Sequence, residues 1–300
     1  MKRYILIIGM SFLLGETNYP GLLTWTNTPT MSLAGGGRLV FNAESDRLNP
    51  ATLSYGKNRQ FNGSLLQFPS EIRVESISFF SPKGKFNRSL SFRHQSFGVF
   101  QGYDDEANET EKYQSGETHI TIAIAKKVEN TPLRWGMSTT FLYSQLDEYS
   151  STGLAFNAGS ILDITPFGMA IGINIENVGF ILSPYTETKE KIPSQIAMSL
   201  SKKLAHLPLQ IMLEALYDLQ NEEVAISFSG IFKISNGIQL RLGTSSERIN
   251  QNIKQSVSQS AMSGTGFGLD YSSHDYHIGI GSYFYGTGGW IHGVEFGGRF

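Results

Sequence analysis

The sequence predicts an all-β protein, a single transmembrane antiparallel β-barrel of about 14 strands with an N-terminal plug segment in its lumen. Three observations support this prediction. Apolar and polar residues alternate with a period of two along most of the chain, the alternating segments are long, and the long connections between them fall at one end.

Alternation with a period of two is the mark of a strand whose two faces meet different surroundings. In the segment EVAISFSGIFK, Val224, Ile226 and Phe228 share one face, whereas Ala225 and Ser227 point to the other. The segments GIQLRLG, GMAIGINIE and HITIAIA repeat this pattern, and helical periodicity is nearly absent. The chain is therefore expected to consist mainly of strands.

Fourteen such segments can be counted, and most of them run nine to thirteen residues. A strand in a soluble protein commonly has about five or six residues, whereas a tilted strand that crosses a bilayer needs roughly 9–11. The length of the segments favours a membrane barrel. The predicted strands are 59–67, 71–80, 85–97, 118–127, 132–144, 152–164, 167–176, 194–202, 208–218, 223–233, 237–246, 263–272, 275–285 and 290–300.

The connections give a separate argument for a barrel. The gaps after even-numbered segments are short, whereas the long gaps, 98–117, 177–193 and 247–262, follow the third, seventh and eleventh segments. In an up-and-down meander these odd-numbered gaps lie at the same end. Short turns at one end and long loops at the other are the layout of outer-membrane barrels, and a soluble sandwich gives no reason for it.

The N-terminus predicts export from the cytoplasm. Lys2 and Arg3 precede YILIIGMSFLLG, an apolar run that is too short to cross a bilayer as a helix. Residues 1–20 are therefore predicted to be a signal peptide, with cleavage between 15 and 24. The alternative is a buried N-terminal strand or helix.

Residues 21–58 are predicted to form a hatch or plug segment, and residues 59–300 the barrel. The stretch before the first regular strand is rich in glycine, is interrupted by Pro50, and is too irregular to face lipid. An even-stranded barrel can hold such a leader in its lumen as a plug. Asn49 followed by Pro50 fits the opening of a turn, because proline fixes φ. The alternative is a disordered periplasmic leader.

The chain ends on an alternating strand, WIHGVEFGGRF, with Phe296 and Phe300 on one face. In hydrocarbon every backbone N–H and C=O needs a partner, so the last strand must pair with the first and close the sheet. A terminal Phe on such a strand also resembles the signal that outer-membrane proteins present to the barrel-insertion machinery. Phe296 and Phe300 are predicted to form this signal. The alternative is the final strand of a soluble β domain.

Little in the sequence points to catalysis, so we expect no enzyme activity, no cofactor and no metal. The net charge of −2 gives no argument for nucleic acid, and the absence of cysteine excludes a thiolate site. His274 and His277 fall on opposite faces of a strand, and the acidic loop 101–117 lacks the glycine of a calcium-binding loop. Three acidic residues are expected to face a polar lumen: Glu176, Glu214 and Asp218.

Several segments resemble known outer-membrane proteins. The stretch DRLNPATLS, which contains Asn49, Pro50 and Ala51, resembles the NPA hatch motif of the FadL-like and PorV/PorQ families. The stretches 90–117, 141–161 and 193–219, and the turn INIENVG, are similar to segments of the PorV/PorQ family in the same order and spacing. The resemblance spans residues 30 to 220.

This resemblance implies a fourteen-stranded FadL-like barrel of the type IX secretion system, in the outer membrane of a Gram-negative bacterium. Its role would be non-enzymatic. It would hold a PorZ-like surface protein, with PorU and PorV as further partners, in the complex that attaches secreted cargo to lipopolysaccharide. The alternative is a FadL-like transporter that moves hydrophobic small molecules across the outer membrane, for which an apolar lumen pocket and a kink in one strand are needed.

The anchoring role would use the long surface loops. Tyrosine supplies a large contact area at small entropic cost, and charged groups set the choice of partner. The loop residues predicted to bind the surface partner are Tyr103, Asp104, Asp105, Glu106 and Tyr185.

Overall fold

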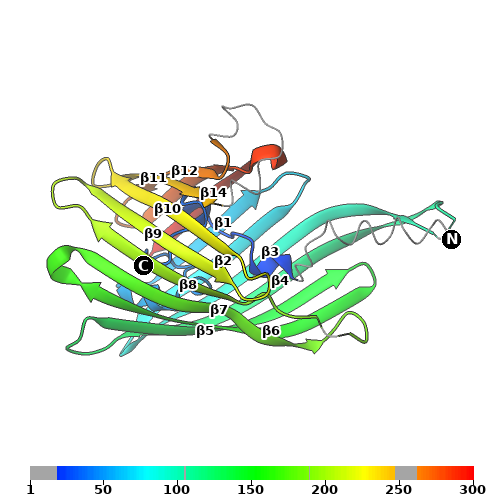
Figure 1. The fold of residues 1–300 in the computed structure, drawn as a ribbon, viewed down its shortest axis with the longest axis horizontal. Coiled ribbons are helices and arrows are strands. Elements are labelled where there is room, and N and C mark those ends of the chain that lie inside the picture. Colours follow the sequence, from blue (N-terminus) through cyan, green and yellow to red (C-terminus); the bar gives the residue numbers. More distant parts are fainter. Residues whose placement is uncertain (1–18, 105, 189, 247–261) are drawn as a thin grey trace.

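The computed structural model describes residues 19–104, 106–188, 190–246 and 262–300. These residues form fourteen antiparallel strands that close into one barrel (Figure 1), as predicted. The strands are β1 (Gln60–Gln67), β2 (Arg73–Lys83), β3 (Phe86–Tyr103), β4 (Glu109–Lys127), β5 (Leu133–Leu146), β6 (Tyr149–Ile164), β7 (Met169–Ser183), β8 (Gln195–Lys203), β9 (Leu209–Asp218), β10 (Val224–Lys233), β11 (Ile238–Ser245), β12 (Thr265–Ser272), β13 (Tyr276–Phe284) and β14 (Trp290–Arg299).

The barrel is closed by its first and last strands. β1 and β14 pair antiparallel over the whole length of β1, from Gln60 opposite Arg299 to Gln67 opposite His292. The N–H of Phe300 continues this ladder by donating to the carbonyl oxygen of Arg59 at 3.0 Å. The predicted pairing of the last strand with the first is confirmed.

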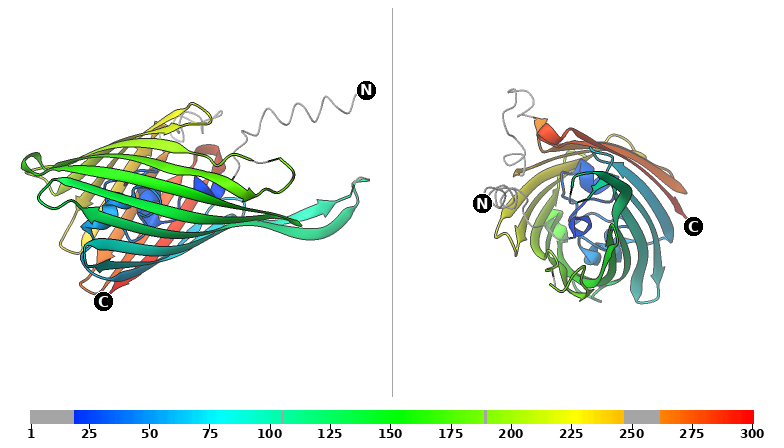
Figure 2. Two further views of the ribbon diagram at one scale, coloured as in Figure 1. Left: turned by 90° about the horizontal axis from the view of Figure 1, so that it is seen from below. Right: turned by 90° about the vertical axis from the view of Figure 1, so that its right-hand side faces the viewer.

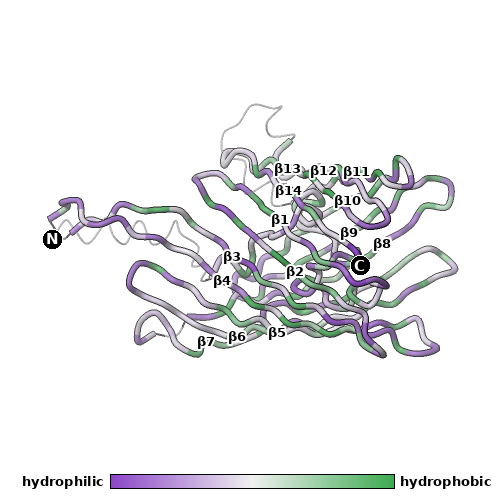
Figure 3. The backbone as a smooth tube through the Cα atoms, turned by 180° about the vertical axis from the view of Figure 1, so that it is seen from behind, coloured by the Kyte–Doolittle hydropathy of each residue, from purple (hydrophilic) through white to green (hydrophobic). Residues whose placement is uncertain are grey.

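The two faces of the sheet differ in polarity, and hydrophobic and hydrophilic residues alternate along the strands (Figure 3). On β2, Ile77 and Phe79 are exposed on the outer surface, whereas Ser76 and Ser78 are buried inside. An apolar exterior around a polar interior is the inverse of a soluble protein and matches a lipid surrounding. The protein is an outer-membrane β-barrel. Among the described residues, no helix is long and apolar enough to cross a membrane.

The connections lie at the two ends as predicted, but two strands are longer than expected. The β3–β4 ladder continues to Tyr103 opposite Glu109, so most of the predicted loop 98–117 is strand. A register shift between Ser96 and Gly98, where Gly98 has φ 99°, interrupts the period-two pattern and hides this continuation in the sequence. The extended hairpin projects beyond the rim of the barrel (Figure 2). β7 likewise continues to Ser183, past the predicted end at 176.

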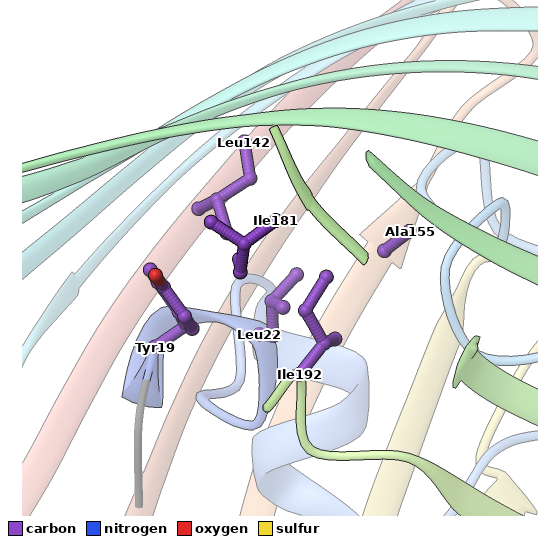
Figure 4. Close-up of a cluster of buried hydrophobic side chains, with 6 residues drawn as sticks. All are labelled: Tyr19, Leu22, Leu142, Ala155, Ile181 and Ile192. Carbon is purple, nitrogen blue, oxygen red and sulfur yellow. The ribbon is translucent and has the colours of Figure 1, made fainter. Parts of the chain in front are cut away.

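The segment before β1 occupies the lumen, as the end-on view in Figure 2 shows. It contains the 3-10 helix η1 (Pro20–Leu22), the α-helix α2 (Thr28–Ser32) and the 3-10 helix η2 (Pro50–Tyr55). Tyr19 and Leu22 pack against Leu142, Ile181 and Ile192 of the barrel (Figure 4). We call residues 19–59 the plug. Residues 1–18 of the predicted signal peptide lie outside the described residues, and the predicted loop 247–262 does so except for its last residue.

Candidate functional site

The predicted hatch motif opens the 3-10 helix η2 deep in the lumen. Asn49 is the N-cap residue, and its Oδ1 accepts a hydrogen bond from the N–H of Ala51 at 3.1 Å. Pro50 follows at the first helical position, where a missing N–H costs nothing. All three motif residues are buried. The motif therefore fixes the local shape of the plug at the point where it contacts the wall.

The wall is hollowed where the hatch motif packs. Gly136 of β5, Gly159 of β6 and Gly172 of β7 face the plug, and we call them the hatch notch. A Cβ atom at Gly136 would lie 2.4 Å from the carbonyl carbon of Pro50, and one at Gly159 would lie 2.2 Å from Asn49 Oδ1. These positions accept the plug because they carry no side chain.

A second set of glycines receives helix α2 on the other side of the lumen. A Cβ atom at Gly266 of β12 would lie 2.4 Å from the carbonyl oxygen of Met31, and one at Gly243 of β11 would lie 2.3 Å from the carbonyl carbon of Leu33. The plug is thus held between two glycine-lined regions of the wall, one on β5–β7 and one on β11–β12.

Buried ion pairs join the plug to the wall. Arg38 of the plug pairs with Glu176 of β7 (Nε to Oε1, 2.7 Å) and with Glu214 of β9 (Nη1 to Oε2, 3.2 Å). The N–H groups of Gly37 and Arg38 also donate to Glu214 Oε1. The predicted lumen position of Glu176 and Glu214 is confirmed. Asp46 of the plug forms a second buried pair with Arg93 of β3.

Two buried carboxylates lie on the β13–β14–β1 side of the plug. Glu44 Oε1 accepts from Asn62 Nδ2 at 2.9 Å and from Ser76 Oγ at 2.8 Å. Glu295 of β14 accepts from Thr28 Oγ1 at 3.1 Å. Burial, together with the charge of Glu295, raises the pKa of Glu44, a plug residue, to about 7. Protonation of Glu44 is therefore expected to favour the docked plug.

Three cavities follow the plug from the outer end of the barrel to the periplasmic end, where the short turns lie. The outer cavity, of about 530 Å³, is lined by apolar and uncharged groups that include Trp25, Phe68 and Ile291. The internal cavity, of about 200 Å³, shares Leu23 and Trp25 with the outer one and is lined by Arg38, Glu176, Glu214 and Asp218.

The periplasmic cavity, of about 520 Å³, lies beside the turns that follow β6 and β8 and is lined in part by Leu39, Phe41 and Tyr55. Arg38 lines the internal cavity and Leu39 the periplasmic one. The ion pairs of Arg38 therefore lie where the plug separates the two cavities.

The structure separates the predicted loop residues. Tyr103 and Glu106 are exposed on the projecting hairpin, and Asp105 lies outside the described residues. Asp104 is exposed too, and hydrogen bonds from Asn108 lower the pKa of its carboxyl group.

Tyr185 is half-buried and packs against the plug, so its role in binding a surface partner stays a prediction. Its ring stacks on Tyr19 with 6.0 Å between centroids, and its hydroxyl group is hydrogen-bonded to Ser144. Burying the aromatic ring against the plug removes more apolar surface from water than pointing it outward would.

The predicted insertion residues lie on the outer surface near the periplasmic end. Phe296 of β14 is exposed and packs near Phe61 of β1, with 6.0 Å between ring centroids. Phe300 is 71% exposed and follows the last strand directly. An exposed aromatic side chain at the end of a strand is typical of the aromatic girdle at the membrane interface. Recognition by the insertion machinery remains a prediction.

The plug residues that make the buried ion pairs and hydrogen bonds were not singled out from the sequence. Arg47 donates from Nη1 to the carbonyl oxygens of Gly21 and Leu22, both at 3.0 Å, and so ties two turns of the plug together. The sequence offers one indication of these buried pairs: a segment otherwise rich in small residues contains four charged ones, Arg38, Glu44, Asp46 and Arg47. Within the described residues, no group of three His, Asp or Glu is placed to hold a metal ion.

Comparison with known proteins places the fold. No family model matches the chain, and no curated protein matches it in sequence. The toluene transporter TodX of Pseudomonas putida is similar in structure, with a TM-score of 0.60 and 9% identity, over 92% of this chain and 97% of TodX. A FadL homologue of Pseudomonas aeruginosa has a TM-score of 0.55 and 11% identity, over 91% and 97% of the two chains.

A mutant of TodX that is described as a monoaromatic hydrocarbon channel has a TM-score of 0.53 and 10% identity, over 91% and 94% of the two chains. At these identities the similarity shows the fold. The fold, a closed fourteen-stranded barrel with an N-terminal segment in its lumen, is similar to the folds of these proteins.

Proposed function

We propose that this barrel takes up uncharged apolar small molecules at the cell surface and passes them across the outer membrane when its plug shifts. The observation that carries the proposal is the apolar outer cavity and its shared wall, Leu23 and Trp25, with the internal cavity. Ligand sites are concave and lined mainly by apolar and aromatic groups, as this cavity is. Among the described residues, no charged side chain lines it, so a charged solute would lose its hydration there without compensation.

Two of the strand ladders also contain register shifts, which can produce the kink in the wall that a transporter needs. The ladder between β3 and β4 shifts register at Gly98, and the ladder between β6 and β7 shifts between Phe156 and Ala158. Asn177 adopts φ 56° at the second site. Irregular backbone of this kind is retained where it has a role in shaping a site or terminating regular pairing. The similarity to a toluene transporter and a FadL homologue supports transport over anchoring.

Uptake is tested in outer-membrane vesicles that keep lipopolysaccharide in the outer leaflet. The fluorescence of N-phenyl-1-naphthylamine rises as it reaches the inner leaflet, and its rate of rise is compared for the wild type, Leu23→Glu and Leu23→Met. We expect Leu23→Glu to slow entry at least 10-fold, because a charge is placed between the outer and internal cavities, and Leu23→Met to leave it unchanged. Equal rates in vesicles with and without the protein would refute transport of this probe.

A second candidate function is the anchoring of a surface protein of the type IX secretion system. The observation in its favour is the β3–β4 hairpin, which projects beyond the rim and exposes Tyr103, Asp104 and Glu106 (Figure 2). A PorZ-like protein, with PorU and PorV, would dock on this hairpin, and lipopolysaccharide would surround the barrel.

The hairpin is tested by shortening 101–114 and recovering partners from detergent-solubilised outer membranes. Anchoring predicts that a surface partner is lost while the barrel still inserts and keeps its heat-modifiable mobility on gels. Unchanged surface attachment of secreted cargo would rule this role out. Loss of apolar solute uptake with secretion intact would favour the transporter.

A further inference from the structure

A row of polar side chains crosses the lipid-facing surface on one side of the barrel. It runs over six neighbouring strands, β13, β14, β1, β2, β3 and β4. Its members are Ser282, His292, Gln67, Arg73, Glu75, His94 and Thr118, and we call it the outer polar row. Exposed apolar side chains lie on β7 to β10, on the other side of the barrel, for example Ile173, Met198, Leu213 and Phe228.

The members of the row are linked to one another across the strands. His292 Nδ1 and Ser282 Oγ are 2.8 Å apart, and His292 lies directly opposite Gln67. Glu75 lies directly opposite His94, whose Nδ1 is 2.9 Å from Thr118 Oγ1. The row is therefore continuous from β13 to β4.

At its β13–β14 end the row lies within the apolar band. On β14, Trp290 lies one outward position nearer the cell surface than His292, and Val294 one position nearer the periplasm. On β13, Phe284 and Ile280 bracket Ser282 in the same way. The rings of Trp290 and Phe284 pack together with 4.9 Å between centroids, as in an interfacial aromatic girdle. His292 and Ser282 therefore lie below the girdle.

Arg73 and Glu75 are the charged members of the row. They are two residues apart on β2, both face outward and both are exposed. Within the described residues neither forms an ion pair. A charged side chain on the lipid face of a barrel destabilises it, and the more so the deeper it lies. Where the row lies within the apolar band, contact with lipid alone is thus unfavourable.

We propose that the β14–β1–β2–β3 face docks a second copy of this chain, related to the first by a two-fold axis along the membrane normal. In such an interface the same surface lies on both sides. A face that carries one cation and one anion close together is complementary to itself, so that Arg73 of one copy pairs with Glu75 of the other. The polar members around them supply hydrogen-bond donors and acceptors to the same contact.

Charge reversal tests this pairing in native outer membranes. Because the chain has no cysteine, Gln67→Cys places a single thiol in the row, and a bismaleimide then crosslinks neighbouring copies. Two differently tagged copies are expressed together, so that a crosslinked species containing both tags identifies a second copy. Met198→Cys, on the far side of the barrel, is the matched control reporter and is expected to give no crosslink.

We expect Arg73→Glu and Glu75→Arg each to lower the yield of the doubly tagged species at least 10-fold. The double variant Arg73→Glu/Glu75→Arg restores opposite charges between copies and is expected to recover most of it. Heat-modifiable mobility shows that every variant is folded. Absence of a doubly tagged species in the wild type, crosslinking to a different protein only, or no recovery in the double variant would each overturn the proposal.

Discussion

The side chain of Asn49 lies so close to Gly159 that a Cβ atom there would come within 2.2 Å of its Oδ1. The Asn49 turn can therefore occupy this place only because residue 159 of β6 has no side chain. Asn49 shapes the plug through its bond to Ala51, and Gly159 lets that turn approach the wall. The missing side chain at Gly159 therefore helps to set the position of the plug, together with the wall side chains that form ion pairs with it.

Adding one methyl group to the hatch notch is expected to loosen the plug. Gly136→Ala and Gly159→Ala force the Pro50 turn away from the wall, and overpacking of this kind costs about 1–3 kcal/mol. Single-channel recordings in planar bilayers should then show more frequent open events. Gly63→Ala is the control, because the nearest atom to its added Cβ, the carbonyl oxygen of Ser76, is 3.6 Å away. Equal opening in all three variants would mean that the notch does not hold the plug.

Removing the charge of Arg38 is expected to release the plug more strongly. Arg38→Met leaves Glu176 and Glu214 buried without a cation, and breaking a buried pair in this way costs about 3–5 kcal/mol. Protease cleavage within 35–45, measured on intact barrels in detergent, should become faster. Arg38→Met/Glu176→Gln/Glu214→Gln removes the uncompensated charges and should return cleavage toward the wild-type rate. If the triple variant is cleaved as fast as the single one, the ion pairs are not the cause.

Plug docking is expected to weaken as the pH rises from 5 to 8. The pKa of Glu44 is raised to about 7 in the docked plug, so protonation favours docking. This contribution is complete below the ordinary pKa of a glutamic acid and is lost as the pH rises through about 7. The shift corresponds to on the order of 3 kcal/mol. Channel opening measured against pH should show this rise, and Glu44→Gln should abolish it. An unchanged pH profile in that variant would assign the effect to other groups.

Deleting Phe300 is expected to lower the amount of barrel in the outer membrane several-fold. The deletion removes the exposed terminal ring and the bond from its N–H to Arg59 that extends strand pairing. Fractionation followed by immunoblotting measures the loss. Phe300→Tyr keeps an aromatic residue and should insert normally. Wild-type membrane levels after deletion would show that the terminal residue is incidental.

The strands and their pairing could be predicted because each strand has one apolar and one polar face, and the period of two survives in the sequence. It fails at the bulge near Gly98, where an extra residue reverses the faces, so the sequence predicts a loop where the hairpin in fact continues. The presence of a plug could be predicted from Pro50 and the glycines. Its contacts could not, because Arg38 meets residues 138 and 176 positions away, and only the closed barrel brings them together.

The pairing of Gln60 with Arg299 also constrains the order of assembly. β1 keeps one unpaired edge until β14 has been synthesised and can pair with it. Every earlier intermediate exposes two unsatisfied edges and a broad apolar surface, both of which promote aggregation. Synthesis alone therefore cannot complete this molecule one strand at a time. We therefore expect the chain to depend on a chaperone before insertion and on a template that pairs with the first strand until the barrel closes.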